Sequence, residues 1–140
     1  LPTIISSLDF KRPEVVLPYP NKESFGTYPP FQAAIEECIN RMMAAYGMPA
    51  LHYTYGPTFF PGALVGLLPA EDKGFGWGIN AFLMFLAHCK NISFRAVPVS
   101  ARHDRDVQEG LETEFLRVRQ LKEYVAAIED ATKSKQEVAL

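Results

Sequence analysis

Apolar residues recur along the chain at spacings that predict its helices. After Pro29 and Pro30, apolar positions repeat every three or four residues until Gly47 and Pro49 interrupt them. Proline suits the first turn of a helix, and glycine followed by proline suits its end. We therefore predict a helix between Pro30 and Gly47 whose apolar side chains face the core: Phe31, Ile35, Cys38, Ile39, Met42 and Tyr46.

The helical spacing is clearest toward the C-terminus. Apolar side chains step by three or four residues there, at Val107, Leu111, Phe115, Val118, Leu121, Val125 and Ile128. Asp106 fits the N-cap of this helix, and Glu109 fits the acid of a capping box. The pattern predicts one long amphipathic helix of roughly 25 residues that packs this face on the body of the protein. Residues 131–140 are expected to form a frayed tail.

Two short runs rich in β-branched residues predict strands at residues 14–20 and 92–99. Between them, residues 51–69 are aromatic and are repeatedly broken by glycine and proline, which favours a short strand, a turn and a short helix from Pro61. The segment "INAFLMFLAHC" is apolar nearly all round and predicts a helix buried on most sides. The elements together predict an α/β fold, a small mixed sheet flanked by helices.

Composition narrows the class of protein. A chain of 140 residues forms one domain, residues 1–140, with a substantial core. Cys38 and Cys89 lie within apolar helical patterns, so we expect buried thiols in a reducing compartment and a cytoplasmic protein. A formal charge of −2 gives no basic face for nucleic acid. The longest apolar stretch, residues 81–87, is far shorter than the roughly 20 residues that span a bilayer, so no membrane span is predicted.

Polar chemistry concentrates in "ARHDRDV", directly after the second predicted strand, where α/β folds place ligands. His103 offers an imidazole, and Asp104 and Asp106 offer carboxylates, which are groups that bind divalent cations. The start of a helix explains both aspartates equally well, and a single histidine in a loop is often only solvated. A metal site and a simple helix start therefore both remain open. The "DRD" element has the form of the Asp-X-Asp of sugar-nucleotide enzymes, but its place at a helix start argues against that role.

The segment "GFGWGINAF", residues 74–82, sets alternate glycines around the chain's single tryptophan. A dinucleotide-binding loop would need glycine where Ile79 stands, and no Lys-Ser or Lys-Thr pair follows as in a P-loop. The segment is therefore not a phosphate-binding loop. Glycines on both sides give Trp77 room to lie at the rim of a cleft, which predicts a binding role for this side chain.

Taken in order, these elements resemble the C-terminal half of a glycosyltransferase of the nucleotide-diphospho-sugar type, closest to the mannosylglycerate-synthase-like and related family-2-like enzymes. The resemblance covers about residues 13–130. "VVLPYP" and the loop with Thr27 are similar to the acceptor-side strand and loop, and "PPFQAAIEECINRMMAAYG" to the helix that follows. "FGWGINAFLMFLAHCKNISFRAVPV" is similar to the family's Gly-Ile-Asp, apolar helix and strand. "ARHDRD" is similar to the segment whose histidine completes the metal site.

The resemblance implies the acceptor-side half of a GT-A-type fold. It also implies transfer of a sugar from a nucleotide-sugar donor to a small hydroxylated acceptor. A divalent metal, Mn²⁺ or Mg²⁺, would be bound in the full enzyme, and no cofactor otherwise, with His103 as the metal ligand. Trp77 and Gly78 would shape the acceptor pocket, with Tyr19 and Thr27 on the opposite wall.

The chain departs from the family pattern at two positions. Asn80 stands where the family has an acid, and an amide cannot accept a proton from an acceptor hydroxyl as a carboxylate can. Gly56 and Pro57 replace a Gly-Gly turn at which substrate approaches the backbone. The nucleotide-binding first half is also absent from these 140 residues. We therefore expect the chain to be the C-terminal portion of a larger protein and to be inactive alone.

Two alternatives to the enzyme remain open. One is a non-catalytic binding or assembly module derived from the same fold, for which Asn80 is the main evidence. The other is a structural α/β protein unrelated to sugars. A half-domain would also expose the apolar face that its other half covers, so we expect either a homo-oligomer or association with a missing N-terminal half.

Overall fold

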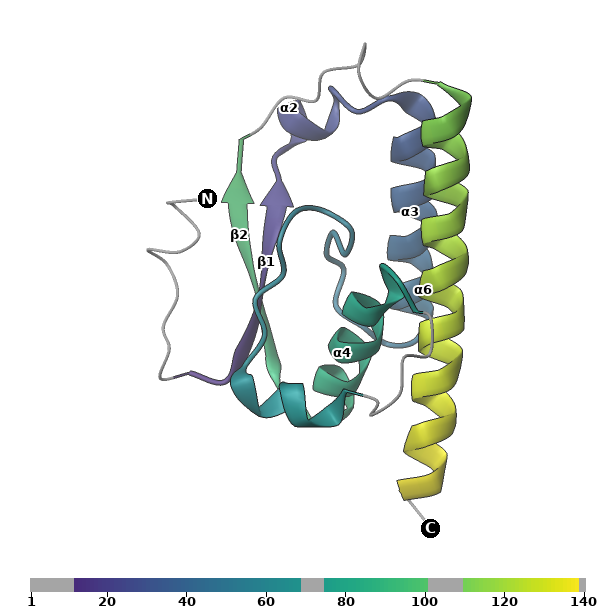
Figure 1. Cartoon of the computed structure of the whole chain (residues 1–140). Helices are drawn as coiled ribbons and strands as arrows, with labels where there is room; N and C mark the ends of the chain where they lie inside the picture. Colours follow the sequence, from purple (N-terminus) through teal and green to yellow (C-terminus); the bar gives the residue numbers. More distant parts are fainter. Residues whose placement is uncertain (1–11, 69–74, 101–109, 139–140) are drawn as a thin grey trace.

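The computed structural model describes residues 12–68, 75–100 and 110–138 of the chain (Figure 1). The sheet lies on one side of the molecule, α3 and α6 run alongside each other on the other side, and α4 lies between them (Figure 1). The elements follow in the order β1 (Glu14–Pro20), α2 (Lys22–Phe25), α3 (Pro30–Ala45), η1 (Gly62–Leu67), α4 (Gly78–Cys89), β2 (Ser93–Val99) and α6 (Leu111–Val138). The mixed α/β class and the long C-terminal helix are confirmed.

The sheet has two strands in the described part of the chain. β1 and β2 pair in parallel, with Leu17 opposite Ala96. On the other edge of β1, Val16 and Phe59 exchange two backbone hydrogen bonds of 2.9 Å in an antiparallel bridge. The predicted strand near residue 51 is wrong, because the backbone N–H of Tyr53 donates to the Asn40 side chain at 3.1 Å instead of to a neighbouring strand. The predicted short helix after Pro61 is present as the 3-10 helix η1.

α3 buries a face that only partly coincides with the one that its apolar spacing predicts. The predicted core residue Ile39 is buried as expected, together with Met43 and the polar residues Gln32 and Glu36, whereas the predicted core residue Cys38 is exposed. Cys38 and Cys89 are both free thiols, and Cys89 is only partly buried. The prediction of two buried thiols is therefore wrong. The face that packs inward carries two polar side chains because it borders a cavity, described below.

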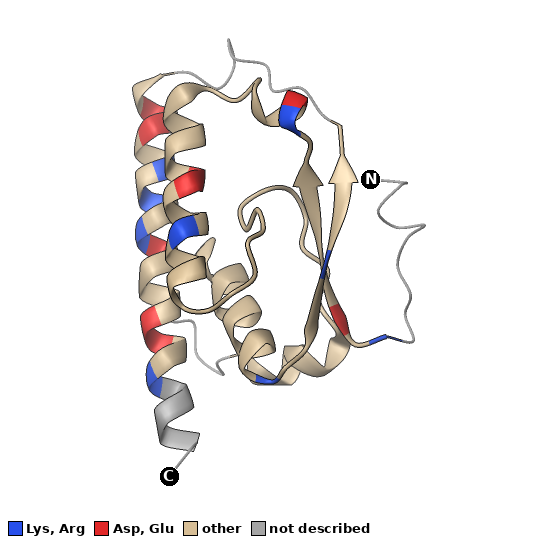
Figure 2. Cartoon of the chain, turned by 180° about the vertical axis from the view of Figure 1, so that it is seen from behind, with Lys and Arg blue, Asp and Glu red and all other residues tan. Residues whose placement is uncertain are grey.

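α6 also turns an unexpected face inward. Its predicted core residues Leu111 and Phe115 are each 72% exposed, and Val118 lies half exposed on the same stripe. In its second half the predicted core residue Ile128 is buried as expected, but it is buried together with Tyr124, Ala127 and Ala131, which lie outside the predicted stripe. The helix continues to Val138, past the point where the sequence predicts fraying. Charged residues of both signs lie along its length (Figure 2). The predicted capping residues Asp106 and Glu109 lie outside the described residues.

Close contact between α4 and α6 explains two glycines of the "GFGWGINAF" segment. A Cβ atom on Gly78 would lie 2.2 Å from the Glu123 carbonyl oxygen and 2.9 Å from the Ala127 Cβ, so only glycine lets the two helices approach this closely. Gly76 has a φ of +51°, and a Cβ there would lie 2.4 Å from Glu123 Oε2. These glycines serve helix packing, and they hold Trp77 between them.

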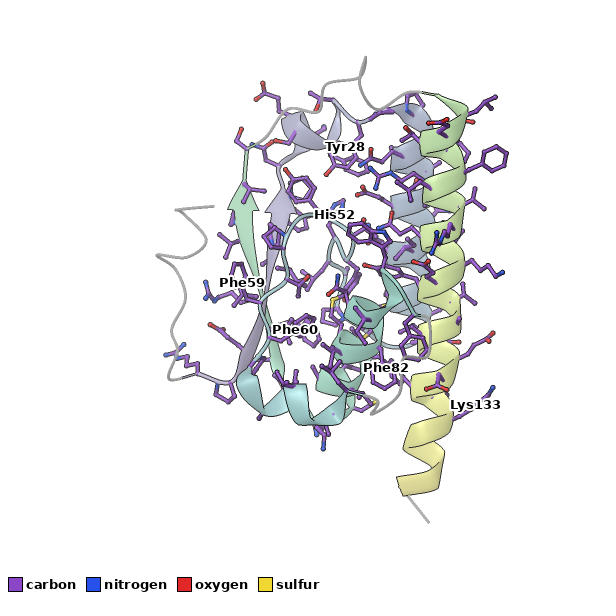
Figure 3. All side chains as sticks on the ribbon, in the orientation of Figure 1. Tyr28, His52, Phe59, Phe60, Phe82 and Lys133 are labelled. Carbon is purple, nitrogen blue, oxygen red and sulfur yellow. The ribbon has the colours of Figure 1, made fainter. Side chains whose placement is uncertain are left out.

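No helix within residues 12–68, 75–100 and 110–138 combines the length and the apolar character needed to cross a membrane. The most apolar helix, α4, is 12 residues long and is buried on several sides within the core. Phe82 of α4 lies toward α6 (Figure 3), and its ring centroid is 5.3 Å from that of Phe75. The apolar character of α4 therefore reflects burial inside the protein.

Candidate functional site

A cavity of about 800 Å³ lies where several parts of the chain meet. The segment after residue 53 and the end of β1 form one side, and α3, the start of α4 and the first half of α6 contribute the rest. Its volume is within the range of small-molecule sites. The side chains that bear on its chemistry are Gln32, Glu36, Thr54, Tyr55, Trp77, Asn80, Arg117 and Gln120.

The wall formed by α3 and α6 is polar although it is buried. Gln32 is 4% exposed and Glu36 is 2% exposed, and the Gln32 Nε2 donates to Glu36 Oε1 at 2.9 Å. From α6, Arg117 Nη1 donates to Gln120 Oε1 at 3.2 Å. Buried atoms on the cavity lining that lack a hydrogen-bond partner among the described residues include Gln32 Oε1, Thr54 Oγ1 and Arg117 Nε. Buried polar atoms normally have partners, so these three mark where a bound molecule could supply them.

Glu36 also sets the electrostatics of this wall. Burial raises the pKa of Tyr28, the charges of Glu36 and then Tyr55 raise it further, and Arg117 lowers it. The pKa of Tyr55 is raised by burial and then by Glu36, and the same two causes raise the pKa of Tyr124. The rings of Tyr28 and Tyr55 stack with centroids 6.0 Å apart. The phenol groups around Glu36 therefore stay protonated and uncharged near neutral pH.

Three of the predicted site residues come together at the cavity. Trp77 and Asn80, from the start of α4, both line it, and Trp77 is 55% exposed at its edge. Gly56 lines it from the opposite segment. Gly56 has a φ of +64°, and a Cβ there would lie 3.0 Å from Pro18 Cγ, so the turn requires glycine.

Three others lie elsewhere. Tyr19 contacts the ring of His52 edge-on with ring centroids 4.9 Å apart, and neither residue lines the cavity. Thr27 Oγ1 donates to the Ser24 carbonyl at 2.7 Å and so stabilises the end of α2. Gly78 packs against α6, as described above. Tyr28 and His52 both lie between the sheet and α3 in Figure 3.

The predicted metal ligand, His103, lies outside the described residues. Within residues 12–68, 75–100 and 110–138, no three His, Cys, Asp or Glu side chains come together as a metal-binding group. The described lining of the cavity carries one carboxylate, Glu36, and no imidazole. These lining residues do not by themselves form a donor set for Mn²⁺ or Mg²⁺.

The polar wall is the part of the site that the sequence prediction missed. On α3, Gln32 and Glu36 continue the buried stripe of Ile39 and Met43 at spacings of four, three and four residues. On α6, Arg117 and Gln120 continue the buried stripe of Tyr124 and Ala127. Polar side chains on an otherwise buried stripe are a detectable signal for a site, but the stronger apolar stripe beside each one concealed it.

Glu123 of α6 forms two hydrogen bonds near the edge of the cavity, one with Arg119 and one with the backbone of Trp77. The backbone N–H of Trp77 donates to Glu123 Oε2 at 2.8 Å, and Arg119 Nε donates to Glu123 Oε1 at 2.8 Å. A carboxylate at the start of a helix complements its positive end. Glu123 therefore fixes the backbone of Trp77 while the indole faces the cavity edge.

The chain was also compared with known proteins. No protein-family model, no curated protein and no solved structure matches it.

Proposed function

We propose that this chain is the acceptor-side half of a metal-dependent glycosyltransferase that moves a sugar from a nucleotide-sugar donor to a small hydroxylated acceptor. The observation that carries the proposal is the cavity of about 800 Å³. It combines an exposed tryptophan at its edge with buried amide, hydroxyl and charged groups, which together suit a ligand rich in hydroxyl groups. It also brings together Trp77, Asn80 and Gly56, three residues to which the family resemblance gives a role.

In the proposed reaction, the acceptor hydroxyl oxygen attacks the anomeric carbon of the donor sugar. The bond from that carbon to the diphosphate oxygen breaks, the nucleoside diphosphate leaves, and the hydroxyl proton passes to an oxygen of the departing diphosphate. The Asn80 amide donates and accepts hydrogen bonds, so it orients the hydroxyl but does not take its proton. A divalent metal held by His103 in the complete enzyme would supply positive charge for the departing diphosphate.

A second candidate, a non-catalytic module that binds the same class of ligand, is favoured by one specific observation. Asn80 lines the cavity, yet it lacks the carboxylate that the family carries at this position. Both candidates require ligand binding, and they differ in turnover.

The test uses the complete protein, with whatever sequence precedes Leu1, and measures release of nucleoside diphosphate from nucleotide sugars with Mn²⁺ or Mg²⁺. We expect Asn80→Asp to gain or raise turnover, because it restores the carboxylate. Asn91→Asp, on an exposed residue remote from the cavity lining, is the matched control and should change nothing. We also expect His103→Ala to lose metal-dependent donor binding. Ligand binding without turnover in both the wild type and Asn80→Asp would favour the module over the enzyme.

We also propose that the outward stripe of α6 is covered in the working protein by a second copy or by the nucleotide-binding half that the proposed enzyme requires. Leu111, Phe115 and Val118 expose apolar surface in a row on the face opposite the core. Sedimentation of the isolated chain should show association that Phe115→Glu abolishes. A clean monomer at high concentration would contradict association between copies.

A further inference from the structure

The strongest unexplained feature of the cavity is the charge on its wall. Among the described lining residues, the charged side chains are one carboxylate, Glu36, and one guanidinium, Arg117. We infer that the cavity selects an uncharged polyhydroxylated compound over carboxylated or phosphorylated relatives of that compound, and that Glu36 sets this preference. The inference deepens the proposed function by naming the acceptor class, and it requires only that the cavity binds a hydroxylated ligand.

Arg117 does not make the cavity an anion site. Arg117 and Glu36 line the same cavity, and at the Tyr28 phenol Glu36, which raises the pKa, has a larger effect than Arg117, which lowers it. One of its nitrogens is also engaged with Gln120 at 3.2 Å. Protein sites for carboxylate or phosphate usually present an uncompensated guanidinium with two parallel donors. Here an anion would enter beside a buried carboxylate, which repels it in a medium of low dielectric.

The start of α4 does not supply an anion site either, although a helix N-terminus borders the cavity. The first backbone N–H groups of this helix already have acceptors. Trp77 donates to the Glu123 carboxylate at 2.8 Å, and the N–H groups of Gly78 and Asn80 donate to Phe75 and Trp77 carbonyls at 2.8 and 3.3 Å. The Glu123 charge also offsets the positive end of the helix. Anion binding at helix starts depends on free N–H groups and on that positive end.

The atoms without partners match a hydroxyl group better than an anion. Gln32 Oε1 is an acceptor, Arg117 Nε is a donor, and the Thr54 hydroxyl can act as either. A ligand hydroxyl both donates and accepts, so a compound with several hydroxyls can satisfy all three atoms. A carboxylate or phosphate group placed against Gln32 Oε1 only accepts, so it would leave this oxygen, on a side chain that is only 4% exposed, without a donor.

The test is a calorimetric titration of the chain with matched pairs of sugars. The probes are glucose, mannose and galactose, each compared with its uronate and its 6-phosphate. We expect at least one neutral sugar to bind about tenfold or more tightly than both of its anionic relatives. Equal or tighter binding of the anionic compounds to the wild type would overturn the inference, and so would failure of all three neutral sugars to bind.

The role of Glu36 is tested with a variant and a neighbouring control. Glu36→Gln removes the charge and keeps an oxygen that accepts from Gln32. The anionic sugars should therefore gain affinity, and the ratio of neutral-sugar affinity to anionic-sugar affinity should fall severalfold. Glu37→Gln, on the exposed side of α3 where this residue pairs with Arg41, should leave the ratio unchanged. An unchanged ratio in Glu36→Gln would assign the preference to other groups and overturn the role given to this residue.

Two further measurements keep the inference testable. If Glu36→Gln does not fold, Thr54→Val removes one hydroxyl partner and should weaken neutral-sugar binding severalfold, whereas unchanged binding would contradict the assignment of the ligand to this wall. Failure of the proposed transferase is also distinguishable. Selective binding without turnover by the complete protein removes the enzyme and keeps this inference, whereas turnover of a carboxylated acceptor by the wild type supports the enzyme and removes the inference.

Discussion

Along α6, the residues after Gln120 and the residues before it meet different surroundings. In the second half, Tyr124, Ala127 and Ile128 are fully buried, and the helix approaches α4 so closely that Gly78 cannot carry a Cβ. In the first half, Arg117 borders the cavity. Its Nε atom is buried and lacks a hydrogen-bond partner within the described residues. The contrast indicates that one helix separates two tasks: its second half stabilises the fold, and its first half keeps polar groups available at a site.

The largest expected effect on stability comes from disrupting the close contact between α4 and the second half of α6. In Gly78→Ala, the new Cβ would meet the Glu123 carbonyl oxygen at 2.2 Å, and backbone atoms cannot rotate away. We expect the free energy of unfolding to fall by about 4 kcal/mol, at the upper end for overpacking. Urea denaturation measures it. Gly66→Ala, where a Cβ meets nothing within 4 Å, is the control and should stay near wild type. Equal stability of the two variants would contradict the close packing of α4 and α6.

A second pair compares the two faces of α6 directly. Ile128→Ala removes a side chain with no exposed surface, and we expect it to lose about 3 kcal/mol because a cavity remains in the core. Leu111→Ala, on the outward stripe, removes a side chain of similar size that is 72% exposed. It should change stability by less than about 0.5 kcal/mol in dilute solution. A loss of similar size in both variants would show that α6 is turned differently from the structure described here.

A substitution in the cavity lining should raise the free energy of unfolding instead of lowering it. Thr54→Val replaces a buried hydroxyl that has no partner among the described residues with a methyl group of similar size. We expect a gain of about 1 kcal/mol in the free energy of unfolding, because the desolvated hydroxyl no longer goes unsatisfied. Thr27→Val makes the same chemical change where the hydroxyl donates to Ser24 at 2.7 Å, and it should destabilise. Destabilisation by Thr54→Val would mean that the fold itself uses this hydroxyl.

The smallest expected effect is a pH dependence of stability that arises at His52, just before the segment that lines the cavity. Asn40 Oδ1 accepts the Tyr53 N–H at 3.1 Å, so its Nδ2 faces His52 Nδ1 at 3.4 Å, and the imidazole must be neutral to accept. Burial lowers the pKa of His52 below its ordinary 6.5. The folded protein therefore binds fewer protons than the unfolded chain at and below that pH, and stability falls as the pH falls through this range.

Hydrogen exchange locates this acid effect. We expect the amide of Tyr53 to exchange faster as the pH falls below 6.5, after correction for the intrinsic rate, while the amides of α4 stay protected. His52→Gln should remove this pH dependence because glutamine does not titrate. Equal loosening of α4 in the same range would show that the two parts of the molecule respond as one.

Several elements were predictable because their pattern is local. The helices α3 and α4 and the strands β1 and β2 lie close to their predicted bounds, with prolines and glycines near their ends. Trp77, Asn80 and Gly56 were also predicted for the site, and the structure brings them to one cavity. The strand predicted near Tyr53 was wrong because a side chain far along the sequence, Asn40, takes the backbone N–H that a strand would have used.

The inward faces of α3 and α6 were not predictable in the same way. Each helix carries two candidate stripes, and the more apolar one, with Phe31 on α3 and Phe115 on α6, turns partly or fully outward. The reason is steric. Ala127 beside Gly78 allows α6 to approach α4 closely, whereas a row of leucine and phenylalanine side chains would hold the helices apart.

By itself, the sequence determined where helices and strands form, because periodicity and helix-ending residues act within a few neighbours along the chain. It also determined that Trp77 is framed by glycines. Only the tertiary structure decided that two of these glycines serve the contact of α4 with α6, and that Glu36 and Gln32 face a cavity. Those outcomes depend on the distance between backbones far apart in the sequence, and local spacing carries no record of that distance.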